Sequence, residues 1–240
     1  MKKSKILAIV GPTAGGKTAF SVALAKRAGG EVISCDSMQI YRGMDIGTAK
    51  PTEEEMRGVP HHLLDIAAPE EAFSVCDYVS AATAAADDIL SRGKLPVFCG
   101  GTGLYVDSLL TNTEFSEIKS DAKLRRRLYE YAEENGNDAL FSRLEQIDPE
   151  SAAAIHPNNI GRVVRAIEVF EITGVTMSEH RRRSHSVPTP YKACYIGTGF
   201  EDRELLYRRV EHRIDEMLSN GVIEEARLLF EHGGVSTAAQ

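Results

Sequence analysis

Hydrophobic residues form short continuous runs over the first hundred residues of the chain, and these runs alternate with segments of helical character. The continuous runs are typical of buried strands, and they predict strands at residues 5–10, 31–36 and 94–101. The segments between them predict helices at residues 17–29, 52–56 and 74–93. The last two helices begin with capping-box patterns, Thr52 with Glu55 and Ser74 with Asp77. Strands that alternate with helices predict a parallel sheet wrapped by helices.

From residue 115 to residue 185 the strand patterns disappear. Amphipathic helices joined by short polar turns are predicted there, at residues 121–135, 137–147 and 158–174. A strand pattern returns at 191–200, and a long helix follows at 202–221. This order predicts an α/β core formed by residues 1–114 and 186–240, with an all-helical insertion at 115–185.

A glycine-rich loop joins the first predicted strand to the first predicted helix. Its sequence, GPTAGGKT, meets the phosphate-loop pattern G-x-x-x-x-G-K-[ST] at Gly11, Gly16, Lys17 and Thr18. In this setting the loop N–H groups and the helix N-terminus attract an anion. Lys17 can then reach the outer phosphate, and the Thr18 hydroxyl can hold a magnesium ion. The alternative is a tight glycine turn with a surface lysine, but the strand and the helix around the loop favour a P-loop core.

Charge is distributed unevenly along the chain. The formal net charge of −7 argues against a protein that coats itself in nucleic acid, yet Lys119 to Arg213 carries 16 Lys and Arg against 15 Asp and Glu. Within this segment basic residues cluster at 123–127, 162–165 and 180–183. Any one cluster could be a solvated face, whereas three in one segment of an acidic protein favour a local surface that binds a polyanion.

Cysteine spacing and hydropathy bear on the compartment. The four cysteines are far apart and form no C-x-x-C motif, so neither a disulfide framework nor a zinc site is indicated. Unpaired thiols suit a reducing cytoplasm. Because no stretch is long enough to span a bilayer, we expect no membrane partner.

The residues that follow the other predicted strands suggest a transfer reaction. An ATP-splitting motor places a magnesium-binding Asp after another buried strand, whereas the strand at 94–101 ends in glycines followed by Thr102. The candidate acid is Asp36, which suits a general base beside a phosphate site or, alternatively, a cap or turn residue. Thr102 is either a helix N-cap or a hydroxyl of the site. Together with the P-loop, these residues indicate a transferase pocket, with a second substrate docking on the helical block.

Six blocks of the sequence, in order over nearly the whole chain, resemble the tRNA dimethylallyltransferase family, also called tRNA isopentenyltransferases. They are GPTAGGKT, ISCDSMQIYRGMDIGTAKP, PHHLLDI, VFCGGTGLYVDSLL, IHPNNIGRVVRAIEVFEITG and RVEHRIDEML. The resemblance implies transfer of a dimethylallyl group from dimethylallyl diphosphate to N6 of the adenosine just 3′ of the anticodon in tRNA, with release of diphosphate.

The resemblance also implies a role for each matching residue. Those implied to cradle the donor diphosphate are Gly11, Pro12, Thr13, Ala14, Gly15, Gly16, Lys17, Thr18 and Arg209, with Mg²⁺ near Thr18. Asp36 is implied to accept the proton from N6, while Lys17, Thr102 and Arg213 stabilise the leaving diphosphate. Those implied to contact the anticodon arm are Asp36, Ser37, Met38, Gln39, Thr102, Arg125, Gly161, Arg162, Val163, Val164 and Arg165.

The sequence departs from the family at its end. Family members continue for several tens of residues past GGVSTAAQ, through a glycine–tyrosine motif and helices that help to hold tRNA. The sequence is therefore either a fragment of a longer protein or an unusually short member, and in both cases we expect it to keep the catalytic residues but to bind tRNA less fully. Separately, we expect a monomer in the cytoplasm. Two alternatives stay open at this point. One is a small-molecule kinase, which shares the P-loop and Asp36, and the other is an RNA-binding regulator with a vestigial loop.

Overall fold

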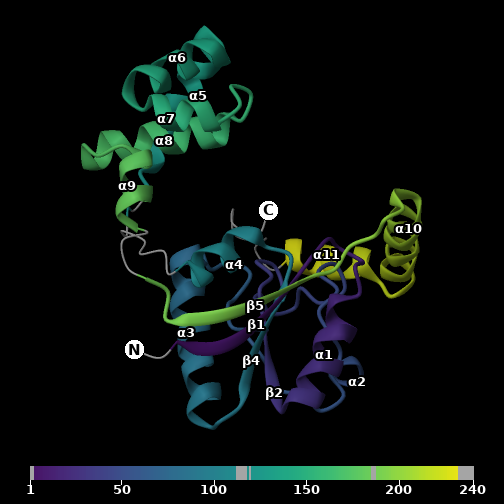
Figure 1. Ribbon diagram of the computed structural model, residues 1–240. Helices are drawn as coiled ribbons and strands as arrows, with labels where there is room; N and C mark the ends of the chain where they lie inside the picture. Colours follow the sequence, from purple (N-terminus) through teal and green to yellow (C-terminus); the bar gives the residue numbers. More distant parts are fainter. Residues whose placement is uncertain (1–2, 112–117, 119, 185–187, 232–240) are drawn as a thin grey trace. The chain divides into compact units, whose positions relative to one another are not determined.

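The computed structural model describes residues 3–111, 118, 120–184 and 188–231, which fall into two compact units (Figure 1). The first, which we call the core unit, comprises Met1–Thr111 and Thr189–Gln240. The second, the helical unit, comprises Asn112–Pro188. The domain boundaries expected from the sequence, at 114–115 and 185–186, lie outside the described residues.

The core unit is built on a five-stranded sheet in which every paired strand is parallel to its neighbour. The strand order is β3-β2-β4-β1-β5. The strands are β1 (Ser4–Val10), β2 (Gly30–Ser34), β3 (His61–His62), β4 (Leu95–Gly100) and β5 (Tyr191–Gly197). A parallel sheet flanked by helices confirms the α/β class predicted from the alternating pattern.

Helices cover both faces of this sheet, because successive side chains of a strand point to opposite faces. On one face, Ile6 and Ala8 of β1 pack with α3 (Val75–Ser91) and α4 (Gly103–Leu110). Tyr78 of α3 and Tyr105 of α4 stack there, with their ring centroids 3.9 Å apart. On the other face, Ile9 packs with α1 (Lys17–Ala28). Both faces are therefore apolar, which explains the continuous hydrophobic runs in the sequence.

Helix starts in the core unit follow the predicted capping chemistry. Thr52 and Glu55 form a complete capping box at α2 (Glu53–Met56), and Ser74 and Asp77 form another at α3. Each box satisfies two backbone N–H groups that the first helical turn leaves unpaired. The long helix predicted after β5 is observed as α10 (Arg203–Ser219), and a further helix, α11 (Val222–Glu231), follows it.

The loops that follow the strands meet at one edge of the sheet, since parallel strands all end there. Two glycines permit their close approach. A Cβ on Gly11 would lie 2.2 Å from Oγ1 of Thr198, and a Cβ on Gly100 would lie 2.2 Å from the carbonyl oxygen of Cys35. Any larger residue would push these strand ends apart. Ligands of open α/β sheets bind at this carboxyl edge.

All regular secondary structure among the described residues of the helical unit is helical. The helices are α5 (Ala122–Asn135), α6 (Asn137–Ile147), α7 (Pro149–Ala154), α8 (Ile160–Thr173) and α9 (Met177–Ser184). Leu140, Leu144 and Ile167 are fully buried and form its centre. Asp148 is 2 % exposed and accepts hydrogen bonds from the backbone N–H groups of Ser151 and Ser178, which ties α7 to α9. None of the helices in the described part of the chain combines the length and the apolar character needed to cross a bilayer.

Candidate functional site

The loop between β1 and α1 has the geometry of an anion-binding turn. The Gly15 N–H donates to the Pro12 carbonyl at 3.2 Å, and Gly16 starts the helix in the left-handed conformation with φ of 75°. Glycine adopts this conformation without steric cost. Gly16 contributes no side chain, so the first N–H groups of α1 remain directed at the pocket.

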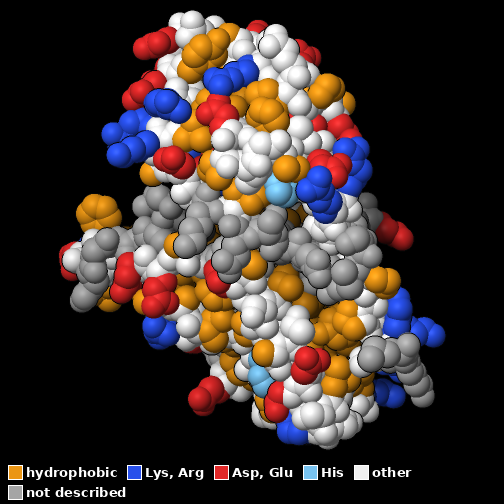
Figure 2. All heavy atoms as spheres, turned by 90° about the vertical axis from the view of Figure 1, so that its left-hand side faces the viewer, with side chains coloured by type: hydrophobic (Ala, Val, Ile, Leu, Met, Phe, Trp, Pro, Cys, Tyr) orange, Lys and Arg blue, Asp and Glu red, His pale blue; other side chains and the backbone are white. Residues whose placement is uncertain are grey.

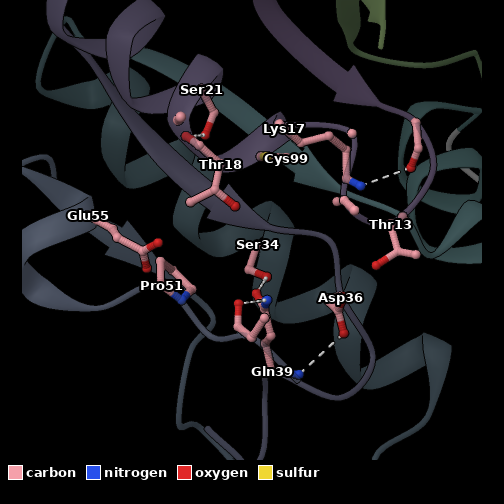
Figure 3. A pocket seen from close by; sticks show the side chains of 18 of the residues that line it. Thr13, Lys17, Thr18, Ser21, Ser34, Asp36, Gln39, Pro51, Glu55 and Cys99 are labelled. Atoms are coloured by element: carbon pink, nitrogen blue, oxygen red, sulfur yellow. Dashed lines mark hydrogen bonds between the residues drawn. The ribbon is translucent and has the colours of Figure 1, made fainter. Parts of the chain in front are cut away.

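Lys17 lies across the mouth of this loop. Its ammonium group donates to the carbonyl oxygens of Gly11 and Pro12, at 2.9 and 2.7 Å (Figure 3). Burial holds the pKa of Lys17 below its usual range, because desolvation disfavours the charged amine. A negatively charged ligand bound in the loop would stabilise the protonated, positively charged form of Lys17.

Helix α10 contributes two arginines to the same loop. Nε of Arg209 donates to the Ala14 carbonyl at 2.9 Å, and Nη1 of Arg213 donates to Oγ1 of Thr13 at 3.0 Å. The Arg209 guanidinium also lies over the Phe200 ring, 5.5 Å from its centroid. The structure thus brings Lys17, Arg209 and Arg213 around one loop, although Arg213 is 196 residues beyond Lys17 in the chain. Such a set of cations suits a ligand with several negative charges.

Asp36 follows β2, and its side chain points into the same pocket beside Gln39 (Figure 3). Oδ1 accepts hydrogen bonds from the backbone N–H groups of Met38 and Gln39, at 2.9 and 3.3 Å. Asp36 therefore stabilises a turn, which was the alternative role expected for it from the sequence. Because both bonds use Oδ1, the carboxylate retains Oδ2 for an exchange of protons with a ligand.

Thr102 occupies the N-cap position of α4 without capping the helix through its side chain. Its Oγ1 instead accepts a hydrogen bond from the Ser37 backbone N–H at 3.1 Å and donates to the Ser37 hydroxyl at 3.4 Å. The Thr102 N–H donates to the Cys35 carbonyl at 3.1 Å. The end of β4 is in this way joined to the turn that carries Asp36, and Thr102 belongs to the site.

Two cavities meet at Asp36. The first, of about 650 Å³, contains the whole phosphate loop together with Thr102, Arg209 and Arg213. The second, of about 470 Å³, is mainly apolar and is lined by Met44, Val210, Ile214, Met217 and Leu229, among others. Thr13, Asp36, Met38 and Arg213 line both. The acid therefore stands between a cationic phosphate site and a hydrophobic chamber.

The second cavity was not predicted from the sequence. Its wall comes from α10, α11 and the loop around Met44, which are distant in the chain and meet only in the folded unit. One available signal was the spacing of Val222, Ala226 and Leu229, which places apolar side chains on one face of α11.

A metal in this pocket would depend largely on the ligand for its coordination. The described residues contain no group of three or more His, Cys, Asp or Glu side chains placed to hold an ion. Thr18 contributes a hydroxyl at the start of α1 that lines the pocket (Figure 3). Mg²⁺ is commonly bound by few protein oxygens together with phosphate oxygens and water, so the residues fit that ion in company with a diphosphate.

In the helical unit, buried Glu168 organises two of the predicted tRNA-binding arginines. Its carboxylate, fully buried, accepts from Nε of Arg125 at 3.0 Å and from Nη1 of Arg165 at 2.6 Å. Arg165 also donates to the Ile118 carbonyl at 3.1 Å. Both arginine side chains keep part of their surface in solvent, at 41 % and 34 % exposed. They therefore stabilise the unit while part of each side chain remains accessible to solvent.

Two residues of the predicted tRNA surface do not belong to it. Val163 and Val164 are 0 % and 1 % exposed and pack in the core of the helical unit, so the expectation that their side chains contact tRNA is wrong. Gly161 and Arg162 are exposed on α8, and Arg165 lies one turn further. On the face drawn in Figure 2, basic, acidic and apolar side chains of this unit are interspersed.

Comparison with known proteins gives consistent matches. A family described as IPP transferase matches residues 39–240, and one described as isopentenyl transferase matches residues 4–70. A tRNA dimethylallyltransferase of Halalkalibacterium halodurans is 51 % identical over 231 residues, 96 % of this chain and 73 % of that protein. One from Geobacillus thermodenitrificans is 52 % identical over 229 residues, 95 % of this chain and 72 % of that protein.

Solved structures agree with these sequence matches. A full-length tRNA isopentenylpyrophosphate transferase from Bacillus halodurans aligns with a TM-score of 0.66 at 48 % identity, covering 96 % of this chain and 71 % of that one. A eukaryotic dimethylallyltransferase, solved acting on tRNA, aligns with a TM-score of 0.77 at 31 % identity, covering 95 % of this chain and 56 % of that one.

Proposed function

The chain belongs to the IPP transferase family, and on that premise we propose how it acts as a tRNA dimethylallyltransferase. It transfers a dimethylallyl group from dimethylallyl diphosphate to N6 of the adenosine just 3′ of the anticodon in tRNA, and it releases diphosphate. One observation carries the assignment of roles. A cationic phosphate loop and an apolar cavity share a wall, and the carboxylate of Asp36 stands on that wall.

The phosphate loop holds the donor diphosphate in this proposal. Backbone N–H groups at the start of α1 face the bound anion, and Lys17, Arg209 and Arg213 neutralise its charge. Lys17 would exchange its present carbonyl partners for diphosphate oxygens. Thr18 would help to hold a Mg²⁺ ion, which would supply further positive charge for the leaving group.

The hydrocarbon end of the donor extends from the diphosphate toward Asp36 and the apolar cavity. During transfer the bond between the allylic carbon and the diphosphate oxygen breaks, and a bond from that carbon to N6 forms. The electron pair leaves with the diphosphate, where fixed donors stabilise the developing charge. We assign this stabilisation to Thr102 and Arg213, which line the same pocket as the loop. The proton from N6 passes to Oδ2 of Asp36, which acts as general base.

The tRNA must present its adenine unstacked, since a stacked base does not enter a pocket of this kind. We assign its reception to the turn at 36–39 and to Thr102. The exposed Arg162 and the partly exposed Arg125 and Arg165 are assigned to the tRNA backbone, where arginine grips phosphate by paired donors. We further propose that the enzyme works as a monomer in the cytoplasm, where its four free cysteines remain reduced.

The kinase alternative is disfavoured. The strand β4 ends in Gly100 and is followed by Gly101 and Thr102, so it brings no carboxylate to the phosphate site for a metal-bound nucleoside triphosphate. The relatives named above are prenyltransferases of tRNA. An RNA-binding regulator with a vestigial loop is disfavoured as well, because Lys17, Thr18 and Asp36 are all present and gathered in one pocket.

Calorimetric titration tests the assignment of the phosphate loop. The protein is titrated with dimethylallyl diphosphate, with inorganic diphosphate and with ATP, each in the presence of Mg²⁺. We expect the prenyl donor to bind more tightly than ATP, and inorganic diphosphate to compete with it. Binding of ATP without binding of the prenyl donor would restore the kinase assignment.

A further inference from the structure

A carboxylate from the last described helix is bonded to a loop of the site that lies far earlier in the chain. Glu225 of α11 accepts hydrogen bonds from the backbone N–H groups of Asp45 and Ile46 through Oε2, at 2.9 and 2.8 Å. Its Oε1 accepts from the Gly47 N–H at 2.9 Å. Three consecutive N–H groups thus converge on one side chain, which is the arrangement by which backbone turns bind anions.

The loop is shaped for this contact. A Cβ on Gly47 would lie 3.3 Å from Oε1 of Glu225, so glycine allows the carboxylate to approach the backbone closely. The other end of the loop is held by Lys50, whose nearly buried ammonium group pairs with Asp45 and Asp65, each at 2.5 Å. The residues 44–50 are therefore fixed from two sides, one of which depends entirely on α11.

This loop is bonded in turn to the turn that carries Asp36. Nε2 of Gln39 donates to the carbonyl oxygens of Thr48 and Ala49, at 3.2 Å each. The backbone N–H of Gln39 donates to Oδ1 of Asp36 at 3.3 Å, a link that Figure 3 shows. A continuous set of hydrogen bonds therefore runs from Glu225 through the loop and Gln39 to Asp36.

The same contact closes one wall of the apolar cavity. Met44, Gly47 and Thr48 line this cavity from the loop, while Val222, Glu225 and Leu229 line it from α11. A carboxylate on an apolar wall is costly unless its charge is compensated, and the three N–H groups compensate it here. These hydrogen bonds join the two segments that form this wall of the cavity, the 44–48 loop and α11.

We propose that Glu225 is a positioning residue for prenyl transfer, because it clamps α11 to the 44–48 loop and so orients Asp36 and encloses the apolar cavity beside it. The proposal rests on the function proposed above. Among the described residues, Glu225 is hydrogen-bonded to the 45–47 loop and not to the phosphate loop or its cations, so its loss should leave binding of the diphosphate group in place. Misplacement of a reacting group by about 1 Å can lower turnover about 100-fold.

The test compares Glu225→Ala and the isosteric Glu225→Gln with Glu224→Ala, a matched control at the exposed neighbour on the same helix. We expect amide hydrogen exchange at Asp45, Ile46 and Gly47 to be accelerated at least tenfold in Glu225→Ala. We expect an intermediate effect in Glu225→Gln, which keeps one acceptor oxygen, and no change in Glu224→Ala. Glu225→Gln also keeps the experiment informative if the alanine variant fails to fold.

Turnover is measured on the same variants. We expect kcat to fall 10- to 100-fold in Glu225→Ala while the affinity for inorganic diphosphate changes less than twofold. Because the effect should run through Gln39, the fall in Glu225→Ala/Gln39→Ala should be smaller than the product of the two single effects. Unchanged exchange at 45–47 would overturn the clamp, and accelerated exchange with parental kcat would overturn the positioning role. Absence of prenyl transfer by the parent protein would instead refute the proposed function, since the exchange measurement needs no substrate.

Discussion

Replacement of Asp36 by asparagine separates the two roles that the structure gives this residue. The backbone N–H groups of Met38 and Gln39 both donate to Oδ1, and an asparagine side chain offers an oxygen at the same place. The turn is therefore expected to persist in Asp36→Asn. What changes is the second oxygen, which becomes an amide nitrogen that cannot take a proton. Alanine, in contrast, removes both roles.

The magnitudes of the two effects differ enough to be distinguished. Loss of a general base lowers turnover by roughly 10²–10⁴-fold, which corresponds to about 2.7–5.5 kcal/mol of barrier. Loss of two hydrogen bonds in Asp36→Ala costs about 2 kcal/mol of stability, at about 1 kcal/mol each. For a protein of this size that is a fall in Tm of about 4–8 °C. Asp36→Asn should melt within about 2 °C of the parent, because its turn bonds remain.

The assay is single-turnover transfer of a radiolabelled dimethylallyl group to tRNA, run beside thermal melts and donor calorimetry. We expect donor affinity in Asp36→Asn to be equal to or above that of the parent, because a negative charge near the diphosphate is removed. Parental turnover in Asp36→Asn would refute the assignment of the base. A fall in turnover that simply followed the fall in Tm across both variants would reduce Asp36 to a turn residue.

Three further changes test other parts of the account. Lys17→Ala should lower donor affinity at least tenfold by calorimetry, whereas Lys26→Ala, at an exposed position, should not change it. Burial lowers the pKa of Lys17, and only the charged amine attracts diphosphate, so the donor affinity of the parent protein should start to fall at a pH below the usual pKa of lysine. Arg162→Glu should weaken tRNA binding in filter assays and flatten its salt dependence, with the Tm unchanged. Arg165→Glu should weaken tRNA binding as well and also lower the free energy of unfolding by up to about 3 kcal/mol, since it removes a partner of a buried carboxylate. Parental tRNA affinity in both variants would contradict the assignment of these arginines to tRNA. Glu31 is 2 % exposed, and hydrogen bonds from Arg92, Lys94 and His62 hold its pKa well below the usual range. The stability that Glu31 contributes is therefore fully present above its unfolded-state pKa and is lost as the pH falls through its folded-state pKa. Glu31→Gln should make the loss of stability at acidic pH less steep, and an unchanged acid dependence would contradict this.

Most of the core unit could be predicted from the sequence because local patterns and tertiary burial agree there. The continuous runs at β1, β2 and β4 reflect a sheet buried on both faces, and the two capping boxes mark helix starts. The helix α4 was not predicted, since five of its eight residues are buried and its sequence shows no polar face. The strand β3 has only two residues and depends on its pairing with β2.

The phosphate loop, Asp36 and Thr102 could be predicted because each begins within two residues of a strand end, and parallel strands end at one edge. The ion pair of Glu168 with Arg125 could not be predicted, because Arg125 reaches it from another helix 43 residues earlier in the chain. The burial of Val164 follows from its place on the inward face of α8 with Ile167, and helical spacing alone already places it there. The clamp of Glu225 on the loop at 45–47 depends on a contact 178–180 residues apart, which no local pattern encodes.

The most direct test of the central claim is the transfer reaction itself. The protein is incubated with unmodified tRNA, Mg²⁺ and radiolabelled dimethylallyl diphosphate, and the nucleosides are then released and separated. We expect label on N6 of the adenosine just 3′ of the anticodon, with one diphosphate released for each group transferred. A tRNA that stays unlabelled, while the protein transfers phosphate from ATP to a small acceptor, would contradict the account.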